Sequence, residues 1–531
     1  MVRERDLQIL GLVAACGVAL ASVVQADDLE ERVERARELP FRRPVPTREI
    51  TRDELREVQA LNFKDSYGDG RGTERELRAL GLLSPEVGFR ETTLGNKAEG
   101  VLGFYIFKPL GSYADGRIYT IPENQQNSGA STKEVAAHEL AHALSDQHHD
   151  LERMFDAIPK TPTGDRHADR QRALFSLEEG VATLVGRASD PNSPHVAAAH
   201  WRDLDYLKAR TQFLYTEGAD FAQHLHDEGG WELIDKAYQS PPTSTEQILH
   251  PERYLAEQQD KPTRVLVPNL AKALPGFRPV KANTLGEFGL SWIAGRDAAS
   301  GWDGDRYVVV ENPETGQAIS SLYTTWDSNR DAAEFHGSLA DSNRGQLAAL
   351  ETGDSLYVEH DGQGNVFTIG GATDEQLPVL REALLRTRKR AEADDHNVAG
   401  APRERASAPI QIADLSGSGR TLIVKSAEGE ERLITLRPAT EAGRERIQAV
   451  LDHLAQSPEA TRVGPDRYVL SGGSSLIEWK EGVFTMGVGT SLAAVEAVEA
   501  RLSRLPAGAA PLTSTSPPAN RGGLIQGLGA R

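Results

Sequence analysis

The chain has 531 residues, 59 basic and 78 acidic side chains, and a formal net charge of −19. The length favours several domains, and the negative charge argues against a nucleic-acid backbone as a partner. Cys16 is the single cysteine, so the chain cannot form an internal disulfide and depends on hydrophobic cores or metal for stability.

The first 26 residues have the pattern of a secretory signal peptide. An apolar run from Leu7 to Val24 follows two arginines, and small residues precede Asp27. Cleavage after Ala26 predicts an exported protein, periplasmic or extracellular. Two alternatives place the N-terminus in a membrane: a lipid on Cys16, or an uncleaved signal anchor. No other segment is apolar enough to span a bilayer.

The segment from Asp65 to Glu76 resembles a calcium-binding loop of twelve residues. Its acidic and glycine residues follow that spacing in part. However, Tyr67 stands where an Asp or Asn ligand is expected, and Gly72 stands where an apolar residue normally packs. The sequence leaves calcium binding here open.

Two apolar segments, Val101–Tyr105 and Arg117–Ile121, predict strands just before the most informative motif. The motif is HELAH at residues 138–142, in a helix that a capping pattern predicts to begin near Ser131. His138 and His142 are four residues apart, so both imidazoles project from one helical face and can share a zinc ion.

The glutamate inside the motif completes the equipment of a zinc peptidase. Glu139 lies beside the histidines and could accept a proton from a water on the metal. A catalytic zinc needs a third protein ligand. The sequence offers Glu179, on a second predicted helix, or His148, six residues past the motif, with Glu178 as the neighbour that only the helix phase separates from Glu179.

These segments carry a resemblance to known families. Residues 138–146, HELAHALSD, are similar to the zinc helix of thermolysin-type peptidases, and residues 177–182, LEEGVA, resemble the glutamate-ligand segment of gluzincin aminopeptidases. With STEQILHPERY at 244–254, the chain resembles a set of secreted bacterial zinc-peptidase-like proteins over roughly residues 39–293. The resemblance implies that Glu139 is the general base and Glu179 the third ligand. The spacing between His142 and Glu179 exceeds the thermolysin pattern.

Three further residues are candidates for supporting roles. Asp146, one turn beyond the second histidine, could hold a ligand imidazole in the correct tautomer. His250 and Tyr254 are candidates for the group that stabilises the oxyanion, because peptidases of this class often place a histidine or tyrosine opposite the zinc. The segment from His195 to Tyr238 is predicted to be largely helical, with an interruption at residues 229–230.

Beyond residue 300 the pattern changes to strands and helices that repeat. Residues 366–370, VFTIG, return as VFTMG at 483–487, and residues 420–424 resemble 306–310, which gives a period near 115 residues. The sequence predicts two copies of a β-β-α-β-β-α module. The last stretch, 506–531, is rich in Pro, Gly, Ser and Thr and is predicted to be disordered.

Together these patterns predict an α+β protein: a mainly helical, zincin-like peptidase domain with a small N-terminal sheet, followed by the two tandem modules. The predicted boundaries are 1–26 (signal peptide), 27–295 (peptidase), 301–390 (first module), 391–408 (linker), 409–505 (second module) and 506–531 (tail). The predicted function is zinc-dependent hydrolysis of peptides or proteins. The alternative is an inactive metal-binding scaffold that acts through the C-terminal modules. The sequence leaves the oligomeric state open.

Overall fold

The structure is a computed structural model that describes residues 26–95, 101–125, 132–189, 204–257, 259–339, 355–390, 417–425, 429–457, 460–470 and 474–505. The predicted signal peptide up to residue 25, the linker at 391–408, the tail at 506–531 and the predicted helix start at Ser131 lie outside these ranges. Within the described residues, no helix has the length and apolarity that a membrane crossing requires.

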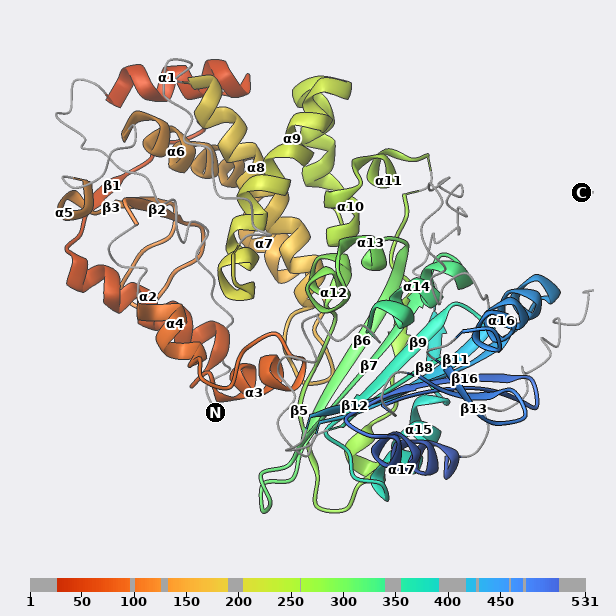
Figure 1. The fold of residues 1–531 in the computed structure, drawn as a ribbon. Coiled ribbons are helices and arrows are strands. Elements are labelled where there is room, and N and C mark those ends of the chain that lie inside the picture. The colour runs from red at the N-terminus through yellow and green to blue at the C-terminus, as the bar shows by residue number, and fades with distance from the viewer. Residues whose placement is uncertain are drawn as a thin grey trace, which may run out of the picture.

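The N-terminal part of the chain is built from helices around a small sheet (Figure 1). Its helices are α1 (Ala26–Arg37), α2 (Arg52–Tyr67), α3 (Arg71–Ala79), α4 (Phe89–Gly95), α5 (Pro122–Gln125), α6 (Thr132–His149), α7 (Leu151–Asp156), α8 (Ala168–Ser189), α9 (Tyr206–Gln239), α10 (Thr245–Leu249), α11 (Pro251–Leu255), α12 (Gly286–Ala294) and α13 (Arg296–Ala299). The sheet has the order β1 (Thr47–Glu49), β3 (Arg117–Thr120), β2 (Gly103–Ile106), so β2 is an edge strand, and it lies against α6.

Helix α8 packs against both α6 and α9, and the three helices share one hydrophobic core. The close approach of α8 and α9 depends on two glycines. A Cβ at Gly180 would meet the carbonyl oxygen of Gly218 at 2.0 Å, and a Cβ at Gly218 would meet the carbonyl oxygen of Ser176 at 2.3 Å. Since only glycine fits such a contact, the two helices touch backbone to backbone here. Helix α9 is interrupted at Gly229 and Gly230, where the sequence predicts a break.

The first turn of α8 is anchored by the segment that carries the third sequence motif. The buried carboxylate of Asp169 accepts hydrogen bonds from the Thr245 hydroxyl at 2.6 Å and from the Thr245 backbone N–H at 3.2 Å. Ser244 caps α10 by accepting from the N–H of Gln247. Tyr254 donates to the carbonyl oxygen of Ser240 at 2.8 Å. The motif therefore ties the start of α8 to the end of α9.

The rest of the chain is dominated by one large sheet. Eleven of the described strands form it in the order β13-β14-β15-β16-β12-β11-β8-β9-β7-β6-β5, with every pairing antiparallel. The strands are β5 (Arg278–Asn283), β6 (Trp302–Glu311), β7 (Ala318–Trp326), β8 (Ser355–His360), β9 (Asn365–Gly370), β11 (Gly417–Lys425), β12 (Glu430–Pro438), β13 (Ala460–Gly464), β14 (Arg467–Leu470), β15 (Ser475–Lys480) and β16 (Val483–Val488). A separate pair joins β4 (Arg264–Leu266) to β10 (Arg388–Arg390), and η3 (Leu270–Ala273) follows β4.

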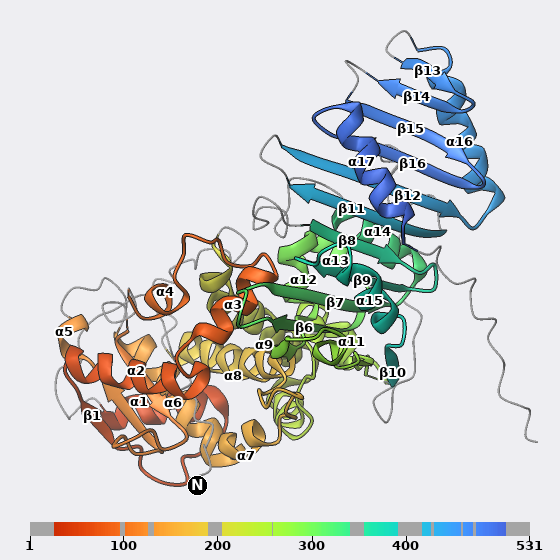
Figure 2. The same ribbon diagram turned by 90° about the horizontal axis from the view of Figure 1, so that it is seen from below.

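Helices cover both faces of this sheet (Figures 1 and 2). Helices α14 (Asn329–Leu339) and α16 (Glu441–Leu454) pack on one face, and α15 (Gln376–Leu384) and α17 (Leu492–Ser503) pack on the other. The core of the N-terminal helices continues onto the α14 face through Trp302 and Phe335. Nearly all residues of β6 to β9 are buried, polar ones included, so these strands show no alternation of buried and exposed positions.

The predicted fold class is therefore wrong. The molecule is rich in sheet, not mainly helical, and β5 already belongs to the large sheet although it lies in the range predicted for the helical peptidase domain. The two copies of the repeat share this sheet, because β8 pairs with β11 from His360↔Gly419 to Ser355↔Val424. The strand order β8-β9-β7-β6 returns as β15-β16-β12-β11, and the edges of the two copies pair with each other. An edge strand offers unpaired backbone groups, so this pairing satisfies both edges at once.

Candidate metal centre

Helix α6 presents the HELAH residues to the interior of the helical part. His142 is fully buried, Glu139 is 3% exposed, and His138 is partly buried. Ala137, Leu140 and Ala141 fill the spaces beside them in the core. A helix buried in this way holds its polar groups in fixed positions, which a metal site requires.

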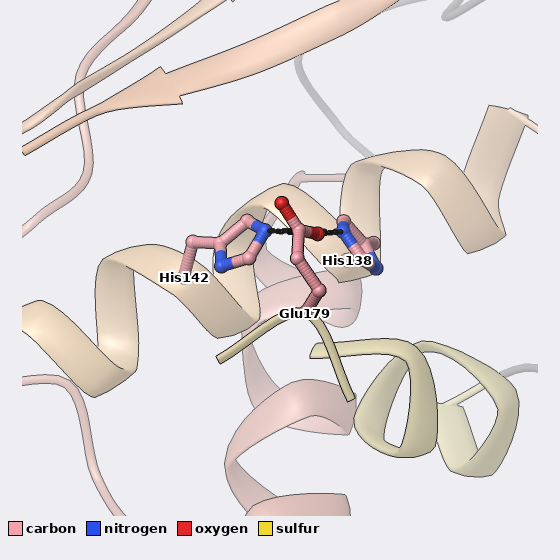
Figure 3. Close-up of side chains that lie close together, drawn as sticks. All are labelled: His138, His142 and Glu179. Atoms are coloured by element: carbon pink, nitrogen blue, oxygen red, sulfur yellow. Dashed lines mark hydrogen bonds and ion pairs between the residues drawn. The ribbon is translucent and has the colours of Figure 1, made fainter. Parts of the chain in front are cut away.

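Three donor atoms from α6 and α8 converge on one point (Figure 3). The Nε2 atoms of His138 and His142 lie 3.0 Å apart, and the Oε2 atom of Glu179 lies 3.1 Å from the first and 3.4 Å from the second. In a tetrahedral zinc site with ligand bonds of about 2.0–2.1 Å, neighbouring donor atoms are about 3.3 Å apart. The three side chains therefore have the spacing of three corners of such a site.

Electrostatics also favour a cation among these side chains. Burial by itself would lower the pKa of His142, but the carboxylates of Glu179 and Glu178 raise it well above its ordinary value. Burial opposes ionisation of Glu179, yet the two histidines hold its pKa below its ordinary value. In the protein alone a proton thus compensates the buried carboxylates, and a divalent cation would fill the same role with more charge.

Glu178, next to Glu179 on α8, points to the other side of the His142 ring. Its Oε1 lies 2.8 Å from Nδ1 of His142, and its Oε2 accepts a hydrogen bond from the hydroxyl of Tyr238. The Tyr238 hydroxyl also lies 3.1 Å from Oγ of Ser145. A carboxylate that accepts from Nδ1–H leaves Nε2 free of its proton and aimed at the metal. Glu178 is thus placed to orient His142.

Glu139 has a buried carboxylate that is only partly satisfied. One oxygen is bound by the backbone N–H of Tyr105 in β2, while Oε2 is buried without a hydrogen-bond partner. Burial raises the pKa of Glu139. A buried carboxylate oxygen without a partner is costly, and a water held by the neighbouring ligands would supply one.

Tyr215 of α9 is a member of this site that the sequence analysis missed. Its ring centre lies 5.9 Å from that of His138, and its hydroxyl is hydrogen-bonded to Glu179. Burial and the charges of Glu179 and Glu139 raise its pKa well above the ordinary value, so it stays protonated and can donate. The available signal was Gly218, three residues later, since a glycine inside a long helix indicates a close helix contact.

The other predicted site residues have partners elsewhere. Asp146 accepts hydrogen bonds from the Tyr105 hydroxyl at 2.7 Å and from the N–H of Leu151 at 3.1 Å. The Nε2 atom of His148 lies 2.8 Å from the carbonyl oxygen of Pro40. The structure thus places neither Asp146 nor His148 among the converging donor atoms.

The two candidates for the oxyanion group also lie in other contacts. The Nε2 atom of His250 lies 3.0 Å from Oε1 of the buried Glu287. Tyr254 donates to Ser240, packs its ring against Phe221, and has a pKa raised to about 12 by burial. These bonds hold α10 and α11 against their neighbours.

The calcium-like segment is not an open loop. Asp65 lies within α2, which continues to Tyr67, and Asp69 accepts from the N–H of Arg71 at the start of α3. Glu76, at the twelfth place, is buried and accepts a hydrogen bond from Tyr307 of the large sheet. The structure gives this segment a role in joining α3 to β6.

A second group of acids could by its spacing hold a metal ion, but a cation already occupies it. Glu246, Asp260 and Asp327 bring carboxylate oxygens close together. The guanidinium of Arg253 lies between them, with Nη1 at 2.8, 2.6 and 2.9 Å from the three carboxylates. This group is an ion-pair network that links α10 and α11 to the loop after β7.

Comparison with known proteins adds one match. Residues 274–381 match a family described as a domain of unknown function (DUF8575). The matched range runs from the end of η3 through the first copy of the sheet repeat to α15, and it does not contain the converging side chains of α6 and α8. No curated protein and no solved structure matches the chain.

Proposed function

We propose that this protein is an exported zinc-dependent peptidase in which His138, His142 and Glu179 hold the metal. The observation that carries the proposal is the convergence of their three donor atoms, 3.0–3.4 Å apart, beside a glutamate whose buried Oε2 has no partner. Two imidazoles and one carboxylate, with a position left for water, are the donor set of catalytic zinc in peptidases.

Zinc bound there would lower the pKa of a water molecule and polarise the carbonyl group of a peptide. Glu139 supplies the base. Its free Oε2 accepts the proton of the attacking water, and its raised pKa brings it closer to the value at which it can also release that proton to the leaving amine. The hydrogen bond from the N–H of Tyr105 fixes the carboxylate in place.

Tyr215 supplies a donor for the oxygen on which negative charge develops. Its hydroxyl is protonated, lies beside His138 and Glu179, and comes from a helix held against α8 by the glycine contact. A donor in a preorganised position of this kind stabilises the transition state more than the ground state.

The neighbouring strand suggests how a peptide would lie. Strand β2 is the edge of its sheet, and a Cβ at Gly103 would lie 3.7 Å from Cγ of Glu139. An extended peptide can add to such an edge through main-chain hydrogen bonds, which recognise polypeptide without requiring one side chain. This supports a peptide or protein substrate.

The experiment compares wild type with Glu139→Gln, using zinc analysis and a peptide library on the full chain. We expect stoichiometric zinc in both proteins and a loss of hydrolysis by about 10²–10⁴-fold in the variant. Glu228→Gln, on an exposed face of α9, is the matched control and should leave both readouts unchanged. A zinc-loaded wild type that cleaves no peptide would instead favour the scaffold that acts through its C-terminal repeats. Absence of zinc after purification in zinc-containing buffer would overturn both.

A further inference from the structure

A cavity lies where the helical part meets the large sheet. It has a volume of about 280 Å³ and is enclosed by the segment before α8, by β4 and the chain after it, and by β6. Apolar side chains such as Pro162, Val265 and Trp302 form much of its wall. The cavity joins the DUF8575 segment to the N-terminal part, because β6 belongs to the first and α8 to the second.

The cavity has a buried cation with bonding capacity to spare. Arg306 of β6 is 8% exposed, and its Nη1 atom is buried without a hydrogen-bond partner. Asp305, the acidic residue in the cavity wall, does not supply one. Its carboxylate accepts from the N–H groups of Leu285 and Gly286, each at 2.9 Å, and from Nε1 of Trp302 at 3.2 Å.

Other positive charges surround the same space. Arg170, in the first turn of α8, Arg264, at the start of β4, and Lys160 also line the cavity. The His167 ring between them is neutral: burial, followed by the charges of Arg306, Arg170 and Arg264, lowers its pKa to about 3. In a chain with a net charge of −19, four basic residues and one acidic residue around a cavity form a local site for an anion.

We propose that this cavity binds a small organic anion, one carboxylate or phosphate group carried on an apolar body. Guanidinium groups bind both oxyanions through two parallel hydrogen bonds, and the N-terminus of α8 adds positive potential. The apolar part of the ligand would pack against the apolar wall of the cavity. Arg170 precedes Glu179 by nine helical residues, a rise of about 13 Å, so the site is separate from the metal centre and does not rest on its proposed function.

The test is calorimetric titration of the full chain with four probes: phenyl phosphate, benzoate, inorganic phosphate and benzamide. We expect both aromatic anions to bind, and inorganic phosphate to bind at least tenfold more weakly because it leaves the apolar wall uncovered. Whichever aromatic anion binds more tightly identifies the preferred oxyanion. Benzamide, which is neutral, should not bind. Equal affinity for benzamide and benzoate, or no binding of any anion at 10 mM, would overturn the proposal.

Variants locate the site. Arg306→Gln should weaken binding of the aromatic anions at least tenfold, and Arg264→Gln, at an exposed position, should weaken it a few-fold. Arg420→Gln is the matched control, since Arg420 holds the equivalent place in the second repeat and also has a buried Nη1 without a partner. Unchanged affinity in both cavity variants, or an equal loss in the Arg420 variant, would contradict the assignment. Unchanged circular dichroism and an unchanged thermal unfolding midpoint verify that each variant folds.

Discussion

Buried carboxylates in the large sheet and in the helical part have different partners. In the sheet, Glu359 of β8 is met by the guanidinium of Arg381, with two hydrogen bonds of 2.6 and 2.7 Å. In the helical part, Glu179 is met by two imidazoles, and Glu139 close by keeps an oxygen without a partner. The first arrangement is complete within the protein. In the second, one oxygen of Glu139 stays unsatisfied, and under the proposed function a metal ion and a water molecule would complete the arrangement.

This difference distinguishes a structural ion pair from a candidate metal site. Glu359 and Glu179 are buried almost equally, so burial alone does not distinguish the ion pair from the candidate metal site. The distinguishing property is the partner: a permanently charged guanidinium with fork geometry, or imidazoles that are neutral or charged according to what else is bound. The comparison predicts that changes in the sheet affect stability, whereas changes around Glu179 affect metal binding and chemistry.

The largest expected effect is on the sheet. Arg381→Met leaves the buried Glu359 without its cation, and we expect the free energy of unfolding to fall by about 3–5 kcal/mol. Chemical denaturation would measure the loss. The double variant Arg381→Met/Glu359→Met should recover most of it, because no uncompensated charge remains. If the double variant is as unstable as the single one, the pair contributes more than charge compensation.

A pH dependence tests the anchor of α8. Burial raises the pKa of Asp169 to about 7, whereas the ordinary value is near 3.9. Between these values the folded protein keeps a proton that the unfolded chain has lost, so the contribution of Asp169 to stability is full below about pH 4 and falls by about 1.4 kcal/mol per pH unit up to about 7. Asp169→Asn should lack this slope. Denaturation of both proteins from pH 4 to 7, in the same chelator-containing buffer, isolates the difference. Parallel curves would contradict the raised pKa.

Tyr215→Phe tests the oxyanion group under the proposed function. Removal of one preorganised donor lowers kcat by about 10²–10³-fold, and zinc content and KM should change little. His250→Gln and Tyr254→Phe are the informative controls, because the sequence pointed to those residues. If one of them loses kcat while Tyr215→Phe does not, the sequence-based candidate is correct and the contacts of Tyr215 are structural.

Much of the local structure could be predicted from the sequence. The strands near residues 103–106 and 117–120, the interruption at 229–230 and the repeated strand order all follow local patterns. The union of both repeats and β5 in one large sheet could not be predicted, because it depends on which edge strands pair with each other. The β8–β11 pairing and the addition of β5 join segments whose local patterns carry no information about their partners.

The candidate metal site likewise has a part that the sequence predicts and a part that depends on helix packing. The spacing of His138 and His142 places them on one face of a helix from sequence alone. Glu178 and Glu179 are both visible in the sequence, but adjacent helical residues point about 100° apart, and the packing of α8 on α6 decides which one meets Nε2 and which meets Nδ1. Tyr215 comes from a third helix, and its position follows from the glycine contact between α8 and α9.

The smallest expected effect is on zinc affinity, and it tests whether Glu178 or Asp146 orients a ligand imidazole. Glu178→Gln removes the charge that holds the Nδ1 proton of His142, and we expect zinc affinity to fall about 10–100-fold while hydrolysis at saturating zinc is retained. Competition with a chelator of known affinity measures the change. Asp146→Asn is the matched control, because the sequence predicted it to orient an imidazole, whereas its hydrogen bonds go to Tyr105 and Leu151. If Asp146→Asn weakens zinc binding and Glu178→Gln does not, the contacts around His142 rearrange when the metal binds. If only Glu178→Gln weakens zinc binding, Glu178 orients His142 while Glu179 binds the metal directly. Metal binding in the helical part then depends on two carboxylates, whereas Glu359 in the sheet is neutralised by the guanidinium of Arg381 alone.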